Sequence, residues 1–220
     1  MIKVRTVFTK LDRAKYISHL DLMRCMTRAL KRSKLKIWYT EGFNPHAYIM
    51  FPLALSLGTE SCAEIMDFNL TEDISFDEVK SRLNAVLPKD IRIVSVKEQE
   101  KKHTEIGFAS YHAEFKLEDR TVEECKEAFE AFLSQESINI EKRSKKKGTV
   151  AVDIKPHVEM SDISVRDGLV CADFTLPAGI PLNLNAGVLL DAFSEPFGNE
   201  FIVKKLERTA ILDSSHNEFV

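Results

Sequence analysis

Strand-like and helical hydrophobic patterns follow one another in the same order twice along this chain of 220 residues. In the first half, apolar residues alternate or cluster as in strands over residues 2–9, 47–57, 63–70 and 90–96, and they recur at helical spacing over residues 19–33 and 75–87. In the second half, the strand patterns are at 108–117, 158–165, 169–176 and 201–208, and the helical patterns at 122–133 and 186–193. Both halves read β-α-β-β-α-β, an order typical of the split unit with helices on one face of an antiparallel sheet. We therefore predict an α+β protein made of two ferredoxin-like units.

The boundaries of these units follow from the polar segments between the patterns. We place the first unit at residues 1–98, a charged linker at 99–107 and the second unit at 108–212. The second unit has an extra hairpin, with strands at 138–143 and 149–154. The last residues, 213–220, are mostly polar and are predicted to be a frayed tail.

Composition narrows the class of protein. The hydrophobic fraction of 44% and the charged fraction of 30% are typical of soluble globular proteins, and no run of about 18 apolar residues predicts a membrane span. The N-terminus has no apolar core of a secretory signal. The four cysteines (Cys25, Cys62, Cys125 and Cys171) are far apart, which argues against a zinc knuckle, an iron–sulfur cluster or a disulfide framework. We expect a cytoplasmic protein with reduced thiols and without a bound metal or other cofactor.

The segment from Lys10 to Lys36 is strongly basic, although the whole chain has a formal net charge of −3. It holds nine Lys or Arg and only two acids. Ser18 is a suitable N-cap for a helix from about His19 to Ser33, with Asp21 in its first turn. On this helix Arg24, Arg28 and Lys31 share the side opposite the apolar stripe. The pattern predicts a surface for a polyanion or an acidic protein face, although a simply solvated charged face has the same pattern.

A second basic run tips the predicted hairpin at Lys145, Lys146 and Lys147. It is either a soluble turn that blunts a sheet edge or a finger that contacts phosphates. The aromatic residues Tyr39, Phe43 and Tyr48 are candidates for stacking on the bases of single-stranded RNA.

Three motifs in the first half carry a family resemblance: Tyr16–Arg24 (YISHLDLMR), Gly42–His46 (GFNPH), and Pro52-Leu53 with Leu57-Gly58 and residues 61–64. Over residues 1 to about 96 the chain resembles the radical-SAM-linked proteins of unknown function, bacterial proteins encoded beside or fused to a B12-binding-type radical SAM protein. The family usually has a second proline after the histidine, where this chain has Ala47. The resemblance implies a radical SAM partner. The chain lacks the Cys-x-x-x-Cys-x-x-Cys that would hold a [4Fe–4S] cluster, so it is not itself the radical enzyme.

Polar side chains around these motifs form the candidate site if the predicted fold brings them together. They are His19, Asp21, Asn44, His46, Glu60 and Glu64, with Tyr16 and Tyr39 nearby in sequence. The helix N-terminus at Ser18 could hold a phosphate, and the two histidines could be acid and base in metal-independent RNA cleavage. His19, Asp21, His46 and Glu64 could also bind a divalent metal. Alternatively, Ser18 and Asp21 only cap a helix, and Asn44-Pro45 only makes a turn.

These patterns favour RNA binding by an accessory protein, and the family resemblance implies that this protein is a partner of a radical SAM enzyme. The expected phosphate-binding or RNA-binding residues are Arg13, Lys15, Ser18, Arg24, Arg28, Lys31, Asn44, Lys145, Lys146 and Lys147. One alternative is a metal-independent endoribonuclease that uses His19 and His46. The other is a protein–protein adaptor that docks on the radical SAM enzyme without nucleic acid. A binding protein is favoured over an enzyme, and no membrane is expected among its partners.

Overall fold

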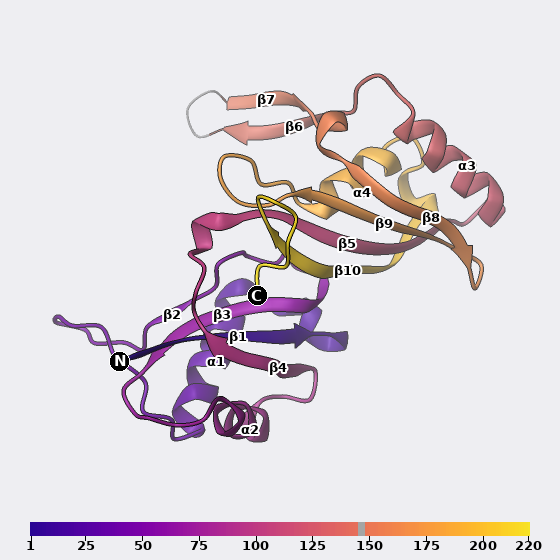
Figure 1. Ribbon diagram of the computed structural model, residues 1–220. Helices are drawn as coiled ribbons and strands as arrows, with labels where there is room; N and C mark the ends of the chain where they lie inside the picture. Colours follow the sequence, from indigo (N-terminus) through magenta and orange to yellow (C-terminus); the bar gives the residue numbers. More distant parts are fainter. Residues whose placement is uncertain (145–147) are drawn as a thin grey trace. The chain divides into compact units, whose positions relative to one another are not determined.

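The C-terminal segment returns to the unit in which the chain begins. The structure is a computed structural model that describes residues 1–144 and 148–220 (Figure 1). Its first compact unit comprises Met1–Ile106 and Arg208–Val220, and its second comprises Gly107–Glu207. The sequence pattern assigns residues 108–212 to the second unit. In the structure, the segment that begins at Arg208 belongs to the first unit instead.

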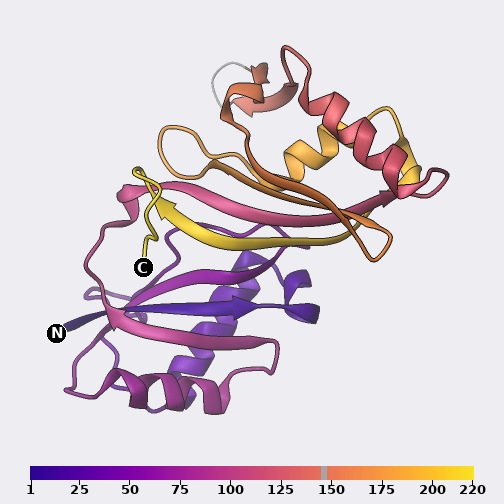
Figure 2. The ribbon, with the colours of Figure 1, turned by 45° about the vertical axis from the view of Figure 1, so that its right-hand side comes forward.

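The first unit is an antiparallel sheet covered by two helices. Its strands are β1 (Ile2–Lys10), β2 (Ile49–Met50), β3 (Glu60–Leu70) and β4 (Ile91–Glu98), and its helices are α1 (His19–Arg32) and α2 (Phe76–Val86). The strand order is β4-β1-β3, with β2 paired to β3, and every pair is antiparallel (Figure 2). A short 3₁₀ helix, η1 (Asp12–Tyr16), joins β1 to α1. The unit is therefore a mixed α+β structure, as the sequence predicts.

Helix α1 forms where the sequence predicts it because its start signal and its apolar stripe agree. Ser18 is the N-cap, and its side chain accepts a hydrogen bond from the amide of Asp21. Leu22, Met26, Ala29 and Leu30 are buried on one side of the helix. They share a hydrophobic core with Val4 and Phe8 of β1, Met66 and Phe68 of β3 and Val79 and Leu83 of α2.

The predicted strand over residues 47–57 is much shorter in the structure, where β2 is only Ile49–Met50. Pro52 lacks the amide that a central strand would donate to its neighbour. Leu53 and Leu55 are buried without belonging to a strand. The apolar run therefore reflects burial of an irregular segment and not a longer strand.

The second unit has the predicted order of elements. Its elements are β5 (Ile106–Leu117), α3 (Val122–Leu133), β6 (Asn139–Ser144), β7 (Gly148–Asp153), β8 (Glu159–Arg166), β9 (Leu169–Pro177), α4 (Ala186–Ser194) and the start of β10 (Phe201–Asp213), with short 3₁₀ helices at Lys155–His157 and Gly198–Glu200. Another 3₁₀ helix, His103–Glu105, lies in the first unit just before β5. Strands β5, β9 and β8 are neighbours, and β6 pairs with β7 in a separate two-stranded sheet. The predicted hairpin is confirmed, and its Lys145, Lys146 and Lys147 lie outside the described residues. Phe115, Phe129 and Phe193 pack together in the core, with ring centroids of Phe129 and Phe193 5.0 Å apart.

The expectation of a frayed tail at residues 213–220 is wrong. Phe219 is only 1% exposed, and its ring lies 4.5 Å from the guanidinium of Arg5. Its amide donates to the carbonyl of Ile211. A carboxylate oxygen of Asp213 accepts from the amides of Ser215 and Asn217 and so closes the turn. The polar composition predicted disorder because the burial of Phe219 depends on Arg5, which is distant in sequence and leaves no local pattern.

We predict that Phe219→Ala lowers the free energy of unfolding by about 3–5 kcal/mol, as truncation of a buried aromatic side chain does. Phe43→Ala is the matched control, because Phe43 is fully exposed, and it should change stability by no more than about 0.5 kcal/mol. Urea denaturation followed by circular dichroism measures both. Equal stability of the Phe219→Ala and Phe43→Ala variants would show that the tail does not pack in solution.

Among the described residues, none of the helices has both the length and the apolar character that crossing a membrane requires.

Candidate functional site

The N-terminus of α1 is occupied by its own side chains. The Ser18 hydroxyl donates to one carboxylate oxygen of Asp21 at 2.8 Å, and Arg24 donates to the other at 3.0 Å. The hydrogen bond from Ser18 and then that from Arg24 lower the pKa of Asp21. An exposed carboxylate therefore stands where a phosphate would approach the helix N-terminus, so this end of α1 favours the capping interpretation over a phosphate site.

The outer face of α1 has cations without acidic partners. Arg28 and Lys31 are exposed, and neither side chain forms a hydrogen bond or ion pair with another residue in the described part of the chain. Arg24 is paired with Asp21, and Arg32 donates to the carbonyl of Val86. We call Arg24, Arg28 and Lys31 the basic face of α1. Its excess positive charge is open to solvent.

The two candidate histidines occupy different settings. His19 is exposed, and its ring meets the ring of Phe51 edge-on, with centroids 5.4 Å apart. His46 is exposed, and its Nδ1 lies 3.0 Å from the Thr40 hydroxyl and 3.2 Å from the Asn44 carbonyl. Within the residues that the structure describes, no hydrogen bond or ring contact joins His19 to His46. The GFNPH loop thus orients the His46 ring through its own backbone and through Thr40.

Glu60 and Glu64 are buried and are each paired with a cation. Glu60 accepts from Lys15 at 2.9 Å, and this hydrogen bond is the main reason that the pKa of Lys15 is raised. Glu64 accepts from Arg208 at 2.7 Å in a fully buried pair. Across residues 1–144 and 148–220, no group of three or more His, Cys, Asp and Glu is placed to hold a metal ion. The combination of His19, Asp21, His46 and Glu64 as metal ligands therefore has no support.

Lys10 and Arg208 also belong to this buried charge cluster, and the sequence patterns indicated neither of them. Lys10 is 2% exposed and donates to the carbonyl of Lys15, and burial is the main reason that its pKa is lowered. Arg208 also donates to the carbonyl of Ala54. The partner of Glu64 is 144 residues away in sequence, so no local pattern marks it.

Four of the candidate residues do meet, around an open hollow of about 430 Å³. Arg13, Lys15, Tyr16 and Glu60 line it together with Asp12, Lys89 and Asp90. The Lys15 ammonium lies 5.5 Å from the centre of the Tyr16 ring. Three bases and three acids share the lining, so the hollow has no excess of either charge. Tyr39 and Asn44 are exposed elsewhere in the first unit and do not line it.

Comparison with protein families gives a direct result. The family model described as "Uncharacterized protein conserved in bacteria (DUF2344)" matches residues 3–180. The chain belongs to this family. No curated protein matches the chain.

Three solved structures are similar to the chain at low scores. "Crystal Structure of a Cbf5-Nop10-Gar1 Complex" has a TM-score of 0.46 at 11% identity, with 93% of this chain and 48% of that chain covered. "Crystal structure of the archaeal box H/ACA sRNP Nop10-Cbf5 complex" has 0.43 at 11%, covering 92% and 46%. "Crystal Structure of an Unknown Protein from Galdieria sulphuraria" has 0.27 at 13%, covering 94% and 98%. The chain spans about half the length of the first two, and scores this low carry no argument about function.

We predict that Glu64→Gln destabilises the protein by about 3–5 kcal/mol, because it leaves the buried charge of Arg208 without its carboxylate. Glu41→Gln is the control, since Glu41 is exposed and forms no ion pair with a described residue. Chemical denaturation measures both. A Glu64→Gln protein as stable as Glu41→Gln would mean that this ion pair does not contribute to the native state.

Proposed function

We propose that this protein is an accessory RNA-binding protein that contacts phosphates through the basic face of α1. The observation that carries the proposal is the contrast between two sets of cations in the first unit. Arg5, Lys15 and Arg208 are each paired with a carboxylate. Arg28 and Lys31 have no such partner among the described residues and stand in solvent. A surface with such an excess of positive charge attracts a polyanion and gains affinity by releasing its counterions.

Exposed aromatic rings in the same unit support RNA as the polyanion. Phe43 at the GFNPH loop is fully exposed, and Tyr39 and Tyr48 are also exposed. The ring of Tyr48 meets the ring of Trp38 edge-on, with the two ring centroids 5.9 Å apart. Such rings bind unstacked bases, which single-stranded RNA offers and duplexes do not.

We interpret the first unit as ferredoxin-like because the order β4-β1-β3, with β2 on the other side of β3, agrees with that of a split β-α-β-β-α-β unit. The second unit repeats the order of elements with the β6–β7 hairpin inserted. This fold carries many functions, so it adds little to the case for RNA. The motif resemblance supports a radical SAM protein as the partner in the cytoplasm.

We predict that the Arg28→Glu/Lys31→Glu variant binds RNA much more weakly than the wild type. Filter binding of single-stranded RNA at several salt concentrations should give a linear dependence of log K on log salt, and the slope should decrease by about 0.7 for each phosphate that the variant no longer neutralises. Both residues are without partners in the described structure, so the substitutions break no ion pair there.

Arg166→Glu/Lys204→Glu is the matched control, because it makes the same change in net charge at exposed positions of β8 and β10 in the second unit. It should retain the wild-type slope. Equal weakening in both variants would mean that net charge, not the basic face, sets the affinity. Absence of RNA binding by the wild type at low salt would overturn the proposal and leave docking on an acidic protein face as the use of α1.

An endoribonuclease is the second candidate, because both histidines are exposed and the His46 ring is oriented by Thr40 and Asn44. If the protein cleaves RNA, His19→Ala/His46→Ala should retain binding and cleave about 100-fold or more slowly, as removal of general acid–base groups does. Gel analysis of end-labelled RNA measures both. Cleavage by the wild type at the same rate as by the variant would exclude the histidine pair as the catalyst.

A further inference from the structure

The sheet of the first unit has a second face that the helices do not cover. Val4 and Phe8 belong to the core shared with α1 and α2. Arg5 pairs with Lys97, and Val7 pairs with Ser95 on β4 and with Ile65 on β3. Paired residues project from the same side of a sheet and successive residues from opposite sides. Arg5, Val7, Ser95 and Lys97 therefore share the face opposite to the helices.

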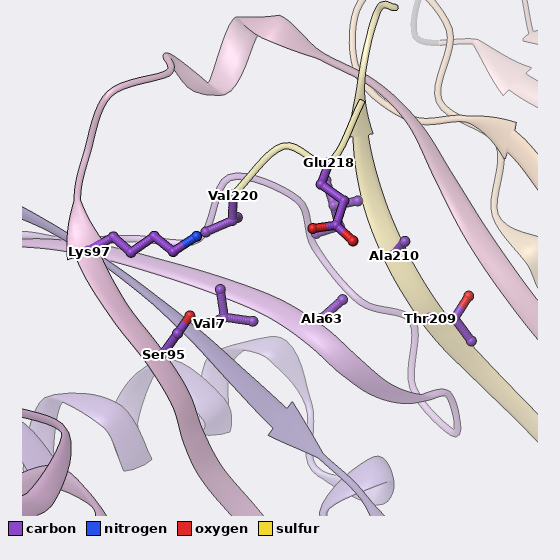
Figure 3. A pocket seen from close by; sticks show the side chains of 9 residues that line it. Val7, Ala63, Ser95, Lys97, Thr209, Ala210, Glu218 and Val220 are labelled. Carbon is purple, nitrogen blue, oxygen red and sulfur yellow. The ribbon is translucent and has the colours of Figure 1, made fainter. Parts of the chain in front are cut away.

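Small residues leave a hollow of about 240 Å³ on this face (Figure 3). It is lined by Val7, Ala63, Ser95, Lys97, Thr209, Ala210, Ile211, Glu218 and Val220, all of which belong to the first unit. Ala63, Ser95 and Ala210 occupy positions where larger side chains would fill the space. Figure 3 shows Val7 and Ala63 along the sheet, with Glu218 and Val220 of the C-terminal segment across from them. The lining is thus partly apolar and polar at its edges.

Two opposite charges line this hollow without forming an ion pair. Figure 3 shows the Lys97 ammonium near Val220 and the Glu218 carboxylate directed into the hollow. Both side chains are exposed, and neither charged group has a hydrogen-bond or ion-pair partner among the residues that the structure describes. Opposite charges that line one hollow match a ligand that bears both charges itself.

The C-terminal wall of the hollow is fixed in place. Phe219, between Glu218 and Val220, is buried under Arg5, and its amide donates to Ile211. Lys101 binds both the carboxylate of Asp213 and the carbonyl of Glu218, at 2.8 and 3.0 Å. The hydrogen bond from Lys101 is the main reason that the pKa of Asp213 falls to about 2, so Asp213 remains ionised at neutral pH. Because this backbone is already ordered, binding a ligand costs little further conformational entropy there.

We propose that this hollow binds a small zwitterion, an α-amino acid with a short apolar side chain. The ligand's ammonium would pair with Glu218, its carboxylate with Lys97 and the Ser95 hydroxyl, and its side chain would contact Val7 and Ala63. The volume lies below the roughly 300–1,000 Å³ typical of sites for drug-sized ligands, which sets the size class. A ligand with only one charge would pair with Lys97 or with Glu218 but not with both, and the other group would keep only its contact with water.

Titration of the full chain with L-leucine, followed by amide NMR shifts, tests the proposal. 4-Methylpentanoate lacks the ammonium and 3-methylbutylamine lacks the carboxylate, so each should bind about tenfold or more weakly than leucine. An absence of shifts at about 10 mM leucine, or equal binding of all three compounds, would overturn the proposal. This comparison needs no variant and is independent of RNA binding.

Substitutions of the lining residues then test whether leucine binds in this hollow. Lys97→Met and Glu218→Gln should each weaken leucine binding about tenfold, while Lys204→Met and Glu123→Gln, at exposed positions of the second unit, should leave it unchanged. Thermal melts confirm that each variant is folded. Wild-type affinity for leucine in both pocket variants would show that leucine binds elsewhere and would refute the assignment of this hollow.

Discussion

A buried ion pair at the centre of the first sheet fixes how its strands align. Arg5 on β1 and Asp67 on β3 are directly opposite each other, and two hydrogen bonds of 2.8 Å join them. Both side chains are almost wholly buried. A slip of one residue would turn one of these charges toward the apolar core under α1, and an unpaired buried charge is strongly destabilising. The ion pair therefore specifies one register for β1, and through it the positions of Val7 and Phe8 on opposite faces.

The same ion pair organises what surrounds it. Gln99, just beyond β4, donates to Asp67, and the ring of Phe219 packs on the guanidinium of Arg5. The end of β4 and the C-terminal segment are thus both attached to one charged centre on β1 and β3. A second buried pair, Arg208 with Glu64, holds the start of the returning segment beside β3. These two pairs bury their cations inside the first unit, whereas Arg28 and Lys31 on the outer face of α1 face solvent.

Sequence patterns predict the parts of this structure whose causes are local. The Ser18 cap, the apolar stripe of α1 and the alternation in β1 each lie within a few turns or residues, and the structure agrees with them. The sequence placed Glu60 and Glu64 in a polar cluster with the two histidines, whereas the structure pairs them with Lys15 and Arg208. These partners are 45 and 144 residues away, so no local pattern indicates them. The prediction of a frayed tail at residues 213–220 is wrong for a related reason, because the burial of Phe219 depends on Arg5 near the other end of the chain.

The basic face of α1 and the hollow near Lys97 belong to opposite sides of one sheet. Strand β1 contributes to both sides, with Phe8 in the core beneath α1 and Val7 in the hollow. A close-packed strand between two surfaces couples them only if it can adopt two discrete arrangements. The register held by Arg5 and Asp67 permits one arrangement, because the alternatives leave a charge unpaired in the interior. An anion on α1 and a zwitterion in the hollow should therefore bind without altering each other's affinity, since neither gains from a shift of β1.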